Sequence, residues 1–416
     1  MSARDVALLV LLASAPAVAS AERLDAAATT VLTGRPDPRN GDVHTVVSVL
    51  QLLELEARDL KGPLAQPLSV TFSGWGGGEL GEPARGQRAV GDIDLLYVRG
   101  VVADRVDVRL GRQLVTGGTA RVLQLDGARV EARLWRGLGA TLHGGVPVLR
   151  ELAWHRGDTL VGGRAFYRQS LLLELGVAAQ RRQERFRMSG EDVAFDQRYR
   201  PLEGLWLTGF QAISIPERRL AEADLRATCQ PADGLELALG VRRTAPDLFL
   251  PRTSVLAVFA ATARDEVGGG AFVRATRSLD LDLEAFLTDA GSGAGHHLAL
   301  RADLVPPRRD RGRLGLEARR IAGGGDGTTF LRGFGRLGLG PALQASASVE
   351  FAHADALRNG VHDAVTGLLA AGWDVQPGWQ LGVSALAGVT PALDQRYEAM
   401  ARLTYQRTRR YVEVRP

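Results

Sequence analysis

Residues 279–287 read LDLDLEAFL, and they are the clearest indication of the fold class. Its odd positions carry leucine or alanine, while Asp280, Asp282 and Glu284 occupy even positions. Because successive side chains of an extended strand point to opposite faces, all the leucines fall on one face and the three carboxylates on the other. Residues 296–304 repeat the alternation, with Arg301 and Asp303 on the polar side. A period of two, with full charges on one face only, indicates a strand that meets a different solvent on each side.

The same alternation recurs almost without interruption from about residue 24 to about residue 407, in roughly twenty-two segments, whereas a soluble β-sandwich has about seven to ten strands. The sequence therefore predicts an all-β protein: a single large antiparallel transmembrane β-barrel with an even number of strands, about 18–22. Two stretches leave alternatives open. Val46–Asp59 fits a strand or an amphipathic helix, and residues 254–263 fit an inward plug or a misplaced strand.

The connections between the segments alternate in length, as they do in barrels with short periplasmic turns and longer outside loops. Aromatic residues such as Trp135 and Trp379 lie near the short turns, which fits an interfacial girdle. The predicted short turns are 102–104, 136–137, 169–170, 231–234, 277–278, 340–341 and 376–378, and the predicted longer loops are 77–90, 147–157, 182–190 and 245–264.

Composition excludes several classes of protein. A mean hydropathy of −0.04 with 24% charged residues excludes an inner-membrane helical protein, which needs apolar runs of about twenty residues. Cys229 is the single cysteine, so no disulfide framework is expected. A net charge of +4 is too small to indicate nucleic-acid binding. His296 and His297 point to opposite faces of a strand and cannot share a metal. We expect no metal, no cofactor, no nucleic acid and no enzymatic activity, since no catalytic motif is recognisable.

The N-terminus has the pattern of a secretory signal. Arg4 precedes the apolar run 6–13, and Ala19-Ser-Ala21 is a small-residue cleavage site. We therefore expect residues 1–21 to be a signal peptide and residues 22–416 to form the barrel, located in the bacterial outer membrane and in contact with its lipid.

Residues 105–134 read RVDVRLGRQLVTGGTARVLQLDGARVEARL. A strand ends in Gly111-Arg112-Gln113, a glycine-bearing loop and Arg121 follow, and Asp126-Gly127 opens the returning strand. This hairpin resembles that of the alginate-export family of outer-membrane porins. The resemblance implies a barrel of about eighteen strands with an arginine-rich lumen. It also implies that the barrel conducts a polysaccharide outward, in partnership with periplasmic polysaccharide-export and co-polymerase proteins.

Arginines on the polar faces are the candidates for lining a channel, because a guanidinium offers a planar, permanently charged fork that matches a carboxylate. Acidic residues are at least as numerous on those faces, so cross-strand ion pairing is expected for most of the charges. An alternative role for Arg112 and Asp126 is to pair across the hairpin and lock it. The candidate residues are Arg105, Arg109, Arg112, Gln113, Arg121, Arg129, Arg133, Arg226, Arg242, Arg301 and Arg319, with Gly111, Asp126 and Gly127 as the hairpin motif.

These observations favour an outer-membrane channel that acts by shape and charge alone, as a passive export pore for an acidic exopolysaccharide. Two alternatives stay open. One is a general or substrate-specific diffusion porin, and the other is a non-conducting structural barrel filled by its own side chains.

Overall fold

The computed structural model describes residues 23–39, 42–60, 68–80, 89–118, 120–148, 158–184, 186–248, 262–291, 293–306, 312–390 and 393–410. The expected signal peptide at residues 1–21 lies outside these residues, as does most of the stretch 254–263.

Twenty-two strands make up nearly all of the described chain, because the period-two pattern runs through each of them. The one helix among the described residues is the short 3-10 turn η1 (Pro246–Leu248). Within this part of the chain, no helix combines the length and the apolar character needed to span a membrane. The strands are β1 (Arg23–Arg39), β2 (Asp42–Leu60), β3 (Leu68–Leu80), β4 (Ala89–Val102), β5 (Val106–Gly117), β6 (Ala120–Arg133), β7 (Leu138–Pro147), β8 (Thr159–Gln169), β9 (Leu173–Glu184), β10 (Arg187–Leu202), β11 (Leu205–Ser214), β12 (Arg219–Ala232), β13 (Leu235–Thr244), β14 (Arg264–Arg274), β15 (Leu279–Asp289), β16 (Ala294–Leu304), β17 (Gly312–Gly323), β18 (Asp326–Gly338), β19 (Leu343–Arg358), β20 (Val361–Gln376), β21 (Trp379–Thr390) and β22 (Leu393–Arg410).

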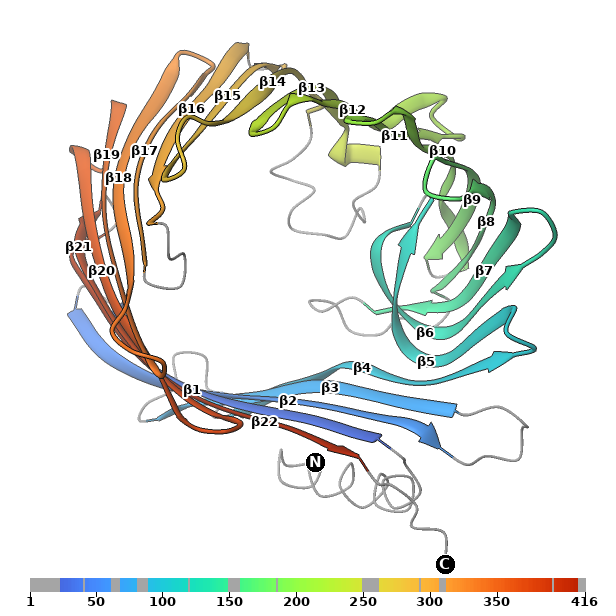
Figure 1. The fold of residues 1–416 in the computed structure, drawn as a ribbon, viewed down its shortest axis with the longest axis horizontal. Coiled ribbons are helices and arrows are strands. Elements are labelled where there is room, and N and C mark those ends of the chain that lie inside the picture. The colour runs from blue at the N-terminus through green and yellow to red at the C-terminus, as the bar shows by residue number, and fades with distance from the viewer. Residues whose placement is uncertain are drawn as a thin grey trace, which may run out of the picture. The chain divides into compact units, whose positions relative to one another are not determined.

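The strands form one antiparallel sheet in which β1 pairs with both β2 and β22. Figure 1 shows these three strands side by side. In register, Thr29 lies opposite Leu52 of β2 and opposite Thr404 of β22. Because the first strand pairs with the last, the sheet closes on itself, and the fold is a closed 22-stranded antiparallel β-barrel. The predicted fold class and even strand number are confirmed, at the upper end of the expected range.

The chain divides into two compact units. The first comprises residues 1–113, 336–349 and 365–416, and it contains the β22–β1–β2–β3 pairing. The second comprises residues 114–335 and 350–364, and it contains the continuous run of pairings from β6 to β17. Val46–Asp59, for which a helix was the alternative, lies within β2, which pairs with β1 and β3.

The strands have one apolar and one polar face. Leucines at alternate positions of β13, β16 and β17 are not covered by other parts of the described chain. Leu239 is 69% exposed, Leu300 is 52% exposed and Leu316 is 70% exposed. An apolar face of this extent, on a sheet that closes on itself, requires hydrocarbon around it. The apolar face therefore contacts lipid and the polar face lines the interior, as in the barrels of bacterial outer membranes.

All seven predicted short turns lie at the junctions between consecutive strands. They are tight: at Gly137, φ is +84° and a Cβ would collide with the Arg168 carbonyl oxygen, so glycine is required there.

The predicted longer loops are correct in part. Three of the four fall between strands, but the loop predicted at 182–190 is wrong: β9 continues to Glu184 and β10 begins at Arg187, because the two strands stay paired to their ends. The predicted alternation in length is also irregular along the whole barrel. Connections that should be long are as short as the turns at 118–119, 185–186, 215–218, 290–293, 324–325 and 359–360, whereas 61–67 and 305–311, on the side of the short turns, are longer.

Candidate functional site

The polar face of β8–β10 is organised by one arginine. Arg164 donates from Nε and Nη2 to the two oxygens of Asp196, at 2.8 and 2.5 Å, and from Nη2 to Glu174, at 2.9 Å. Gly176 of β9 lies opposite Asp196, and a Cβ there would come within 2.5 Å of the Arg164 Nε. The glycine therefore makes room for the guanidinium. With only 15% of its side chain exposed, Arg164 is held by two carboxylates and fixes the wall.

A second ion-pair cluster lies on β16 and β17. Asp303 is 4% exposed and accepts hydrogen bonds from Arg301 at 2.9 Å and from Arg313 at 2.8 and 2.5 Å. Two neighbouring strands thus share one buried carboxylate, as the sequence predicts for most of the polar face.

A third cluster joins β12, β13 and β14. Arg242 of β13 lies 3.2 Å from Asp224 of β12 and 3.7 Å from Glu266 of β14. This predicted channel-lining arginine is therefore shared between the carboxylates of both neighbouring strands.

The hairpin motif has a steric basis. At Gly111, φ is +122° and a Cβ would collide with the Leu96 carbonyl oxygen. At Gly127, a Cβ would collide with the Gly144 carbonyl oxygen. Both glycines are required because a neighbouring backbone approaches closely. Asp126 precedes Gly127 in β6.

Of the polar residues of the motif, Arg112 contacts the preceding strand, β4, and Gln113 contacts its own strand, β5. Arg112 donates to Asp92 at 3.1 Å and to the Ile93 carbonyl oxygen at 2.9 Å. Gln113 is fully buried and donates to the Arg109 carbonyl oxygen at 3.3 Å. The side chain of Arg121 lies outside the described residues. Pairing of Arg112 with Asp126 stays a prediction.

The remaining predicted arginines fall into different environments. Arg105 lies in the exposed turn before β5, and Arg109 is 3.2 Å from Asp107. Arg129 donates to Glu131 at 2.8 Å. Two further candidates are exposed and form no ion pair with a described residue, namely Arg133 and Arg226.

Arginines stack on phenylalanine rings on the polar face of β16–β18. The guanidinium carbon of Arg319 lies 4.6 Å from the ring centroid of Phe330. The ring of Phe334 has Arg301 at 4.7 Å and Arg332 at 5.4 Å. Sequence reasoning named Arg301 and Arg319 but missed the rings and Arg332. The alternation of residues 330–334, FLRGF, was the available signal, since it places both phenylalanines and Arg332 on one face.

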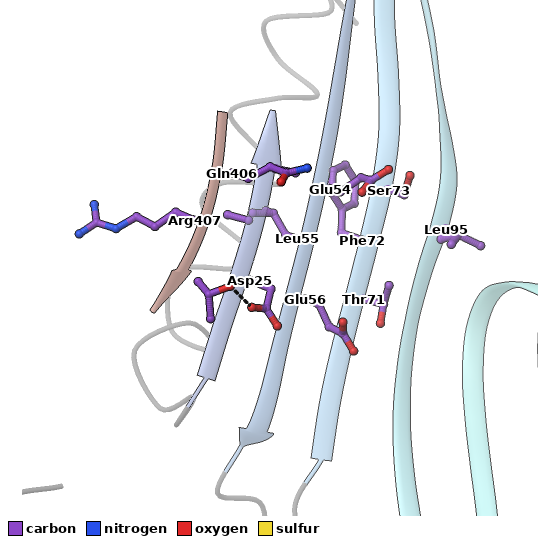
Figure 2. Close-up of a pocket in the computed structure, with 13 residues that line it drawn as sticks. Asp25, Glu54, Leu55, Glu56, Thr71, Phe72, Ser73, Leu95, Gln406 and Arg407 are labelled. Atoms are coloured by element: carbon purple, nitrogen blue, oxygen red, sulfur yellow. Dashed lines mark hydrogen bonds between the residues drawn. The ribbon is translucent and has the colours of Figure 1, made fainter. Parts of the chain in front are cut away.

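A groove with a cavity volume of about 400 Å³ lies over β22, β1, β2 and β3 in the first unit. Figure 2 shows the carboxylates of Asp25, Glu54 and Glu56 along it, while the side chain of Arg407 points away from them. Asp25 accepts a hydrogen bond from the Thr408 hydroxyl at 2.7 Å. The groove is therefore acidic, unlike the arginine-rich face of β16–β18. Within the described part of the chain, no group of three His, Cys, Asp or Glu residues could hold a metal ion.

No protein-family model and no curated protein matches this sequence. Solved structures do match. A chain of the E. coli P pilus tip assembly intermediate PapC-PapD-PapK-PapG is 11% identical with a TM-score of 0.56, over 92% of this chain and 61% of that chain. OccK9 (OpdG) of Pseudomonas aeruginosa is 14% identical with a TM-score of 0.48, over 94% and 100%. The outer membrane protein opdK of the same organism is 10% identical with a TM-score of 0.41, over 93% and 98%. At such identities the similarity concerns the fold alone, which is that of an outer-membrane barrel.

Proposed function

We propose that this protein is a passive outer-membrane pore through which an acidic exopolysaccharide leaves the cell. The observation that carries the proposal is the pairing of β1 with β22, which closes a 22-stranded wall around a charged interior face. A wall of 22 strands is about a fifth longer in perimeter than that of an 18-stranded porin, which itself holds an aqueous channel. The described residues are strands and their connections, and they include no separate domain that fills the interior.

Fixed charges would guide the polymer. Arginines such as Arg164 and Arg301 are held by carboxylates, so the wall keeps its charge pattern while a chain moves past it. The resemblance of residues 105–134 to the alginate-export hairpin supports a polysaccharide as the cargo. The pore has no energy source of its own. Direction would come from periplasmic polysaccharide-export and co-polymerase partners.

Two measurements test the proposal. Purified protein in planar lipid bilayers should carry a stable ionic current, and a deletion strain should lose surface polysaccharide while small-solute uptake stays unchanged. Absence of current from correctly folded protein would favour the non-conducting structural barrel. Current together with intact surface polysaccharide and reduced small-solute uptake would favour the diffusion porin.

A further inference from the structure

Two arginines on the polar face of β17 and β18 are stacked on rings but have no carboxylate partner among the described residues. Arg319 and Arg332 lie over Phe330 and Phe334, at 4.6 and 5.4 Å, and neither forms an ion pair with a described residue. The Nε atom of Arg319 is buried, and no described residue accepts a hydrogen bond from it. Because no described carboxylate occupies the donors of Arg319 and Arg332, the carboxylate of a ligand can pair with them.

The ring of Phe334 is fixed in position. It lies over Gly315 of β17, where a Cβ would collide with the ring. Gly315 is buried, and the ring packs directly against its backbone. The guanidinium of Arg332, which stacks on this ring, therefore loses little further freedom on binding, and its N–H donors in the plane stay available for a carboxylate.

The same chain contains a compensated counterpart. Phe166 has Arg164 at 5.0 Å and Arg168 at 5.5 Å, but both arginines are paired with carboxylates. The donors of that cluster are occupied, so stacking alone does not create a binding site there. The difference between the two clusters is that no described carboxylate pairs with Arg319 or Arg332.

We infer that Arg319, Phe330, Arg332 and Phe334 form a ledge that binds the carboxylate of a uronic-acid sugar. The inference rests on the proposed function, because it names a substrate contact within the same pore. Glu317 lies two residues from Arg319 on the same face, and it limits the net positive charge of the ledge. Binding therefore depends on the directed donors of the two arginines more than on a general positive field.

Block of the bilayer current by hexagalacturonate tests the ledge, with maltohexaose as the neutral control. The Arg319→Gln/Arg332→Gln double variant should raise the half-blocking concentration of hexagalacturonate about tenfold or more and leave that of maltohexaose unchanged. Arg168→Gln removes one stacked but paired arginine, and it should change the half-blocking concentration less than about twofold. The heat-induced shift in gel mobility would confirm that each variant is folded.

Calorimetric titration of hexagalacturonate into detergent-solubilised protein separates the two proposals. Binding that the double variant loses, in a barrel that carries no current, would overturn the pore and retain the ledge. If the protein carries current but the half-blocking concentration of hexagalacturonate is the same for the double variant and for Arg168→Gln, the ledge is overturned and the pore is retained.

Discussion

The substitution Leu239→Arg tests the assignment of the apolar face to lipid. Leu239 lies at the middle of β13 and is 69% exposed, so its side chain meets hydrocarbon near the centre of the membrane. A charged arginine at that depth costs about 2–4 kcal/mol. We expect a loss of about 3 kcal/mol in the free energy of unfolding, measured by tryptophan fluorescence during guanidinium unfolding in phospholipid vesicles.

The matched control is Ala238→Arg, one residue earlier on the same strand. Ala238 points to the interior, and its register partners Thr228 and Gly270 are uncharged and small. An arginine there meets water, so its cost should stay below about 1 kcal/mol. Equal losses for the two variants, or a larger loss for Ala238→Arg, would refute the assignment of the two faces.

The interior face offers three more tests. Gly315→Val should displace the Phe334 ring and lower the free energy of unfolding by about 1–3 kcal/mol in the same experiment. An unchanged free energy would mean that the ring does not pack against Gly315. Arg164→Gln leaves Asp196 without its partner and should lower the free energy of unfolding by about 3 kcal/mol. Arg226→Gln, at an exposed arginine, should lower it by less than about 0.5 kcal/mol. Similar losses for the two variants would contradict the role given to the buried cluster. Glu54→Gln removes a carboxylate from the acidic groove. The reversal potential of the bilayer current, measured in a salt gradient, should therefore shift toward anion preference. An unchanged reversal potential would mean that the groove lies away from the path of the ions.

The barrel was predictable because alternation is a local property. In residues 279–287 the leucines and carboxylates separate on any extended backbone, whatever the strand pairs with. Val46–Asp59 shows the limit of this reasoning, since a short apolar run fits a helix as well. The pairing of β2 with β1 and β3 decided the matter, and pairing is not encoded in the run itself.

The site was predictable only as a set of residues on one face. Arg242, Arg301 and Arg319 were assigned to the polar face from their positions alone. The partners of Arg242 and Arg319 lie on neighbouring strands and depend on register, whereas Arg301 pairs with Asp303 of its own strand. Arg164 and Asp196 are 32 positions apart in sequence and meet because β9 holds a glycine between β8 and β10. The stacking on Phe334 likewise requires a glycine on another strand.

The order of side chains along each strand determined which of them face lipid and which face the interior, because a strand presents successive residues to opposite sides. Only the closed sheet decided which cross-strand ion pairs and ring contacts form, and so which arginines such as Arg164 are neutralised from other strands, because the relative offset of the strands is set by many hairpins together.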